Sequence, residues 1–178
     1  MIMENKNNLL NQDSTLTWCS VEKDHLGSNR VVREETSGIN RMQINHYYPF
    51  GYTFGEYNHC DENTDLQRYK FTGKELDLVH GLRLYDYGAR MYDQILGCWT
   101  SVDPIAEKYY HISPYVFCAD NPVNIIDPDG KVLQIDGNWK ARMTILKELQ
   151  RLTNDNLHID KQGYVTLTFA SDYRINFW

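Results

Sequence analysis

The sequence predicts a mainly β protein of short antiparallel strands, followed near its carboxyl end by one α-helix and a β-hairpin. Three observations carry this prediction. Residues 16–103 alternate between short segments rich in β-branched and aromatic residues and turns rich in glycine or polar residues. Residues 139–152 place apolar side chains at helical spacing. Residues 157–169 alternate again on both sides of a Lys-Gln-Gly turn.

The predicted strands of the first part follow one another as hairpins. Residues 24–28 form a turn in which Gly27 takes the position that needs a positive φ. Pro104 precedes one expected helical turn, at residues 105–110. Strands of about five residues, separated by single glycines, favour an all-β sheet over a helical domain. The predicted strands cover residues 15–21, 29–33, 42–48, 68–72, 82–87, 89–93 and 98–101.

The last part of the chain is predicted to hold a helix over residues 138–154 and a hairpin over residues 157–169. A lone helix and hairpin bury little apolar surface, so we expect this part to be marginally stable unless it docks on the residues before it. The helix is indicated by an apolar stripe at intervals of three and four residues, made by Trp139, Met143, Leu146, Leu149 and Leu152.

These patterns divide the chain into three expected regions. Residues 1–15 are polar and rich in Asn, and are predicted to be a disordered leader. Residues 16–131 form the β domain. Residues 132–178 form a tail of variable sequence.

Composition excludes several classes of function. The 178 residues are 42% hydrophobic and 24% charged, as in a folded globular protein. A net charge of -6 disfavours a nucleic-acid partner, because nucleic-acid surfaces need clustered Lys and Arg. No apolar run reaches the roughly 18 residues of a membrane span. The first residues show no signal peptide, so the chain itself predicts no location.

The cysteines and histidines show no metal-binding spacing. No C-x-x-C pair and no H-E-x-x-H sequence is present. We therefore expect neither a metal nor a cofactor, and reduced, structural thiols at Cys19, Cys60, Cys98 and Cys118.

Eight short segments, in order along residues 24–131, resemble the signatures of the RHS repeat-associated core domain of Rhs/YD-repeat proteins, in its Bacteroidetes type. Each signature alone is weakly specific, but eight in the correct order are highly specific. The segments are residues 24–30 (DHLGSNR), 47–51 (YYPFG), 71–75 (FTGKE), 85–93 (YDYGARMYD), 96–104 (LGCWTSVDP), 113–117 (SPYVF), 120–124 (DNPVN) and 127–131 (DPDGK).

The resemblance implies a fold and a role. In this family YD repeats form a β-sheet that spirals into a hollow shell, the core segment plugs one end, and the variable sequence after it is often a toxin used in bacterial competition. Such relatives are secreted or lie at the cell surface. The resemblance thus implies a plug with a structural, encapsulating role. Its partners would be an upstream YD-repeat shell in the same or a neighbouring polypeptide, and an immunity protein or secretion machinery.

A second reading is a single-turnover aspartyl autoprotease. Some relatives cut their own chain at the end of the core, which here implies Asp103 and Asp127 as catalytic residues and Gly130 and Lys131 as the cleavage position. Two close carboxylates cannot both ionise readily, so one can act as an acid while the other activates water. Lys131 stands where the family has Leu, and Cys98 where it has Arg. Loss of that cation is expected to remove a charge partner of an aspartate and to weaken cleavage.

A third reading is a truncated toxin tip. Residues 132–140 resemble the opening of effector domains that follow such cores, but no catalytic motif of these domains follows before Trp178. No enzymatic activity is therefore expected apart from self-cleavage. All three readings share the same fold.

Overall fold

The computed structural model describes residues 5–10, 16–36, 39–58, 67–78, 81–108, 112–153 and 156–168, and the chain divides into two compact units. The first unit holds residues 1–87 and 91–97. The second unit holds residues 88–90 and 98–178. The predicted fold class is confirmed: the sheets are antiparallel, and one α-helix precedes a β-hairpin.

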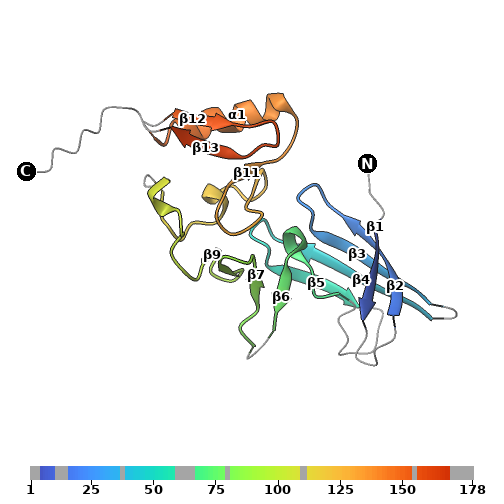
Figure 1. Cartoon of the computed structure of the whole chain (residues 1–178). Helices are drawn as coiled ribbons and strands as arrows, with labels where there is room; N and C mark the ends of the chain where they lie inside the picture. Colours follow the sequence, from blue (N-terminus) through green and yellow to red (C-terminus); the bar gives the residue numbers. More distant parts are fainter. Residues whose placement is uncertain are drawn as a thin grey trace, which may run out of the picture. The chain divides into compact units, whose positions relative to one another are not determined.

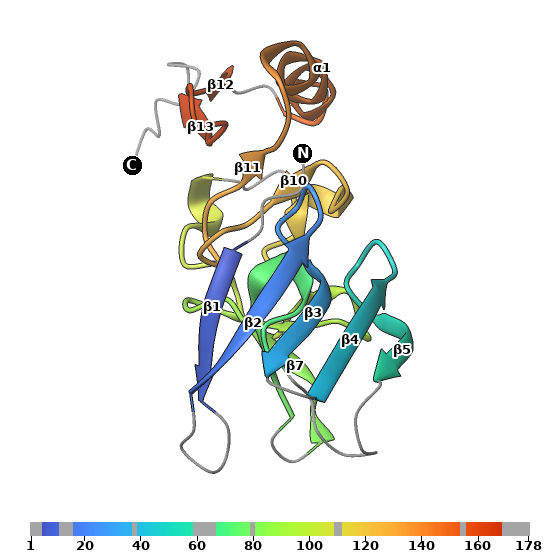
Figure 2. The same ribbon diagram turned by 90° about the vertical axis from the view of Figure 1, so that its right-hand side faces the viewer.

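The first unit contains a five-stranded antiparallel sheet whose strands lie side by side in chain order (Figure 2). The alternation of apolar and polar residues builds its core, since Cys19, Val21 and Val32 turn to the same buried cluster. The strands are β1 (Asn5–Leu10), β2 (Leu16–Lys23), β3 (Asn29–Thr36), β4 (Ile39–Tyr47) and β5 (Thr53–Asn58).

Part of the predicted leader forms a strand. Residues 5–10 are β1, which pairs with β2 in the register Asn5↔Val21 to Leu10↔Leu16. Main-chain N–H and C=O groups pair whatever side chains they carry, so an Asn-rich segment can add to the edge of a sheet. Residues 1–4 and 11–15 lie outside the described residues.

The first unit also holds three strands of a second antiparallel sheet, which lie side by side in chain order. They are β6 (Glu75–Asp77), β7 (Leu84–Asp86) and β8 (Met91–Asp93), with β7 between the other two. The predicted strand at 68–72 is instead a 3-10 turn, Phe71–Gly73, after a single bridge between Tyr69 and Glu75. Thr72 has a φ of 48°, which breaks extended backbone at that point.

The second unit is a series of short elements around Trp99 and Phe117, whose buried rings meet edge to face at 5.3 Å. A bridge pairs Cys98 with Val116. The elements are β9 (Cys98–Trp99), 3-10 turns at Ala106–Lys108 and Cys118–Asp120, β10 (Ile125–Ile126), β11 (Gln134–Ile135), α1 (Trp139–Gln150), β12 (Asn156–Ile159) and β13 (Val165–Thr168).

The tail elements are confirmed, with a shorter helix than the expected 138–154. Asn138 caps α1, since its side chain accepts a hydrogen bond from the Ala141 N–H at 3.0 Å. α1 ends at Gln150, where the Leu152 N–H turns back to the Leu149 carbonyl in a tighter 3-10 bond. α1 contacts β12, which pairs with β13 (Figure 1).

The tail is hydrogen-bonded to the residues before position 132. β11 pairs with β10 on one side, in the register Ile125↔Ile135. On its other side the Val165 N–H donates to the Leu133 carbonyl at 2.9 Å, and the Ile135 N–H donates to the Gly163 carbonyl at 2.8 Å. The position between residues 131 and 132 therefore lies within a continuous hydrogen-bonded structure.

A substitution at Gly51 tests the packing of the first unit. Its φ is +84°, and a Cβ there would lie 2.5 Å from the ring of Phe71, which is buried between Tyr47 and Tyr85. Gly81 has a similar φ of +74° but no heavy atom within 4 Å. We expect Gly51→Ala to lower the free energy of unfolding by about 2 kcal/mol more than Gly81→Ala in urea denaturation. Equal losses would contradict this packing.

Candidate functional site

Arg90 is a buried cation at the centre of the second unit. It follows the turn at Gly88, and the neighbouring Ala89 N–H donates to the Asp129 carbonyl at 3.3 Å. Its side chain is only 3% exposed. A buried guanidinium must find acceptors for its N–H groups, so the residues around Arg90 define a polar site inside an apolar unit.

Two aspartates share one nitrogen of this guanidinium. Arg90 Nη2 lies 3.1 Å from Asp103 Oδ2 and 3.2 Å from Asp127 Oδ2. The Asp127 side chain is fully buried, while 12% of the Asp103 side chain is exposed. Two carboxylates therefore face a single cation, with little water to screen them.

The other acceptors of Arg90 are main-chain carbonyls. Nη1 donates to the Pro114 carbonyl at 3.3 Å, and Nε donates to the Gly130 carbonyl at 2.5 Å. The guanidinium carbon lies 4.1 Å from the centre of the Trp99 ring, a cation–π contact that holds the plane of the group. Arg90 thus joins three segments of the second unit through one planar side chain.

Asp127 is held by the turn that it begins. Its Oδ1 accepts the N–H of Gly130 at 2.8 Å and of Lys131 at 2.9 Å. Gly130 has a φ of +77°, which suits glycine and lets the chain fold back over the carboxyl group. The carboxyl group therefore faces a main-chain turn on one oxygen and Arg90 on the other.

Asp103 is held in the same way. Its Oδ1 accepts the N–H of Ile105 at 2.8 Å, and its own N–H donates to the Pro114 carbonyl at 3.1 Å. The short side chain of Asp and the following Pro suit such a turn. The site thus takes one carboxylate from each of the two Asp-Pro turns.

Burial raises the pKa of Asp127 to about 6, against the opposing effect of the Arg90 charge and of the Lys131 N–H. Because an unfolded Asp titrates near 4, the folded chain keeps a proton that the unfolded chain loses between about pH 4 and pH 6. Stability contributed by this proton is complete below about pH 4 and is lost as the pH rises through 6. The free energy of unfolding falls by ~3 kcal/mol over this pH range because of Asp127.

Cys118 lies beside Asp127 without offering a nucleophile. Burial, and next the negative charge of Asp127, raise the pKa of the Cys118 thiol well above its usual value. The thiolate is the reactive form of cysteine, so a neutral buried thiol is inert. Among the described residues, Cys19, Cys98 and Cys118 form no disulfide, and Cys60 lies outside the described residues.

The peptide bond between Gly130 and Lys131 is contacted at both ends. Its carbonyl oxygen accepts from Arg90, and its N–H donates to Asp127 Oδ1 at 2.9 Å and to Asp129 Oδ1 at 3.1 Å. The Lys131 side chain is exposed and forms no part of this contact. The carbonyl oxygen of this bond therefore faces a cation, and its N–H faces two carboxyl oxygens that accept the hydrogen.

A small hollow adjoins Arg90 and Asp103. It is also lined by Ala106, Pro114 and Leu133, and leaves about 10 Å³ for the centre of a water-sized molecule. That is the room of a single water. The site can therefore accept a water next to the more exposed of its two carboxylates.

The structure brings the predicted aspartates together. Asp103 and Asp127 both contact Arg90, so the pair faces a cation although Cys98 stands where the family has Arg. Arg90 was not predicted from the sequence. A charged residue within an apolar, aromatic strand segment is nevertheless a signal, because it needs acceptors when that segment is buried.

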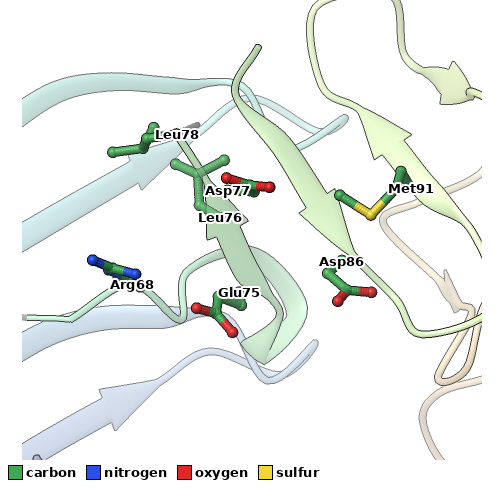
Figure 3. A pocket seen from close by; sticks show the side chains of 7 residues that line it. All are labelled: Arg68, Glu75, Leu76, Asp77, Leu78, Asp86 and Met91. Carbon is green, nitrogen blue, oxygen red and sulfur yellow. The ribbon is translucent and has the colours of Figure 1, made fainter. Parts of the chain in front are cut away.

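The first unit holds a larger hollow. It measures about 570 Å³ and gathers carboxylates of β6 and β7 opposite Arg68 (Figure 3). No cluster suited to hold a metal ion occurs among the described residues. The lining residues of this hollow are Arg68, Glu75, Leu76, Asp77, Leu78, Asp86 and Met91.

Comparison with known proteins supports a relation to toxin subunits. No family model matches the sequence. The chain is 36% identical over 115 residues to salivary gland surface protein 1 of Aedes aegypti, a match covering 65% of this chain and 3% of that protein. It is 33% identical over 89 residues to toxin subunit YenC2 of Yersinia entomophaga, covering 50% of this chain and 9% of the subunit.

Solved structures agree in fold. The crystal structure of TcdB2-TccC3-Cdc42 matches with a TM-score of 0.57 and 27% identity, over 68% of this chain and 6% of that one. TcdB2-TccC3 without its hypervariable C-terminal region matches with a TM-score of 0.55 and 26% identity, over 67% and 5%. The chain spans less than a tenth of the length of each of these relatives. It contains an Rhs-like region related to toxin components of the YenC and TccC type.

The helices of the described residues include none long and apolar enough to cross a membrane.

Replacing Arg90 tests the burial of the cluster. Arg90→Met leaves two buried carboxylates without their cation, so we expect a loss of about 3–5 kcal/mol in the free energy of unfolding at pH 8. The control is Arg151→Met, which breaks the exposed pair with Glu148 (2.7 Å) and should cost less than about 1 kcal/mol. Urea denaturation at pH 8 measures both. Similar losses in the two variants would contradict a buried, coupled cluster.

Proposed function

We propose that this chain is the core segment of an Rhs-type toxin protein, spanning residues 16–131, and that it hydrolyses its own Gly130–Lys131 peptide bond once. The relation to YenC and TccC supports the first part. One observation carries the second part: Arg90 contacts the oxygen, and Asp127 the nitrogen, of the same peptide bond.

Each group has one role in the reaction. Asp103 takes a proton from a water as the water oxygen bonds to the Gly130 carbonyl carbon, and Arg90 Nε stabilises the negative charge that develops on the carbonyl oxygen. Asp127 donates its proton to the Lys131 nitrogen as the carbon–nitrogen bond breaks. The cut first gives a Gly130 carboxylic acid and a neutral Lys131 amine, and the acid then passes its proton to the amine, so the products are a carboxylate and an ammonium group. Asp127 regains a proton from Asp103 through solvent.

The environments of the two carboxyl groups favour this division of roles. Asp127 is fully buried and keeps its proton to about pH 6, which suits an acid. Asp103 is partly exposed and lines the hollow that has room for one water, which suits a base. Trp99 acts through Arg90, because its ring fixes the guanidinium plane that points Nε at the Gly130 oxygen.

A purely structural plug is the second candidate. One observation favours it: Asp127 Oδ1 accepts hydrogen bonds from successive main-chain N–H groups, as a residue that only holds a turn would do. In that case the buried ion pairs fix the fold and the chain stays intact. The two candidates differ in a covalent product, so mass spectrometry separates them.

The cleavage proposal predicts a defined product. Purified chain should convert to two fragments, the second beginning with Lys131, as intact mass and amino-terminal sequencing would show. Asp103→Asn and Asp127→Asn should slow conversion by at least about 100-fold, because each removes one proton-transfer step. Asp120→Asn alters an exposed carboxylate and should leave the rate unchanged.

Other outcomes of that experiment would contradict the proposal. A wild-type chain that stays intact after long incubation would rule out self-cleavage and favour the purely structural plug. A new amino terminus at Pro104 or Pro128 would indicate non-enzymatic acid hydrolysis of an Asp-Pro bond. A new amino terminus at Val132 would overturn the assignment of the bond.

The raised pKa of Asp127 predicts the pH dependence of cleavage. Only the protonated acid can donate, so the rate should fall as the pH rises above about 6 and be about 50-fold slower at pH 8 than at pH 6. A time course of intact mass at each pH measures this, with circular dichroism confirming that the fold is unchanged. A rate that is flat or increases toward pH 8 would exclude Asp127 as the acid.

A further inference from the structure

The residues that follow the Gly130–Lys131 bond are attached to the second unit through more than the covalent chain. β11 lies between β10, which precedes the bond, and the start of β13, which follows it. The Asp136 N–H also donates to the Asn124 carbonyl at 3.1 Å. These contacts join the two sides of the bond through main-chain hydrogen bonds that hydrolysis would leave in place.

Apolar side chains bury the same junction. Ile135 of β11 and Ile125 of β10 are both completely buried, and Leu133 is 8% exposed. Val165 at the start of β13 is 2% exposed. A strand that is hydrogen-bonded on both edges and buried at alternate residues is a well-fitting ligand for the strand beside it.

Hydrolysis would add a charge interaction to this junction. The Lys131 N–H lies 2.9 Å from Asp127 Oδ1 and 3.1 Å from Asp129 Oδ1, and the Val132 N–H lies 3.2 Å from Asp129 Oδ1. The cut turns the Lys131 nitrogen into an ammonium group, whose hydrogen bonds to carboxylates are stronger than those of a neutral amide. Arg90 likewise faces the new Gly130 carboxylate.

We propose that residues 131–178 stay bound after the cut as a strand ligand of β10, with their new amino terminus held by Asp129 and Asp127. The cut alone then does not free the tail; release requires β11 to leave β10. This inference rests on the proposed self-cleavage in one respect: self-cleavage is the reaction that would divide the chain into two polypeptides. The docking surface itself consists of contacts present in the uncut chain.

Size-exclusion chromatography of the full chain after self-cleavage tests this inference. Both fragments should elute in one peak at low micromolar concentration, identified by mass spectrometry. Ile135→Ala, which removes buried contacts of β11, should speed loss of the tail by at least about tenfold, whereas Val123→Ala, at an exposed position, should not. In the protease-cut form described below, which does not depend on self-cleavage, Asp129→Asn should also speed loss by about tenfold.

A second two-chain form separates failure of this inference from failure of self-cleavage. In an Asp103→Asn chain, a protease recognition sequence inserted between Lys131 and Val132, cut at its carboxyl end, makes Val132 the new amino terminus. If wild-type chain stays intact but this form elutes as one complex, self-cleavage is wrong and the docking is supported. If the tail elutes in a separate peak in either form, the docking inference is overturned.

Discussion

The buried guanidinium of Arg90 is the constraint on which the second unit depends. It contacts residues from three stretches of chain, at Trp99 and Asp103, at Pro114, and at the Asp127–Gly130 turn. Desolvating a cation costs several kcal/mol unless acceptors surround it, so these stretches must stay together for the unit to remain folded. The same contacts hold the Arg90 cation against the Gly130 carbonyl oxygen. The side chain that stabilises the unit is therefore also the one that would assist the proposed cleavage.

Local sequence patterns predicted the elements whose formation depends on local spacing. The alternation in β2, β3 and β4, the apolar stripe of α1 and the Gly163 turn between β12 and β13 were each visible in a short window. β1 was missed because edge pairing uses the main chain rather than a side-chain pattern. β10 and β11 were missed because two residues are too few to show a period.

The site was predicted in part. The family resemblance drew attention to Asp103 and Asp127 through their Asp-Pro turns, and the structure places both on one nitrogen. Arg90 was not predicted, because it lies 37 residues before Asp127 and 40 before Gly130, and such a pairing is a product of the fold. The sequence showed Cys98 in place of the family's Arg, but it could not show that Arg90, more distant in the chain, supplies a cation to both aspartates.

In the proposed reaction, water attacks the Gly130 carbonyl carbon with the help of Arg90, Asp103 and Asp127. Incubating the purified chain in water enriched in oxygen-18 and sequencing the first fragment by tandem mass spectrometry tests it most directly. Attack by water on this carbon should leave a single heavy oxygen in the terminal carboxylate of Gly130. A fragment ending at another residue, a heavy oxygen in the side chain of Asp127, or an uncut chain would contradict it.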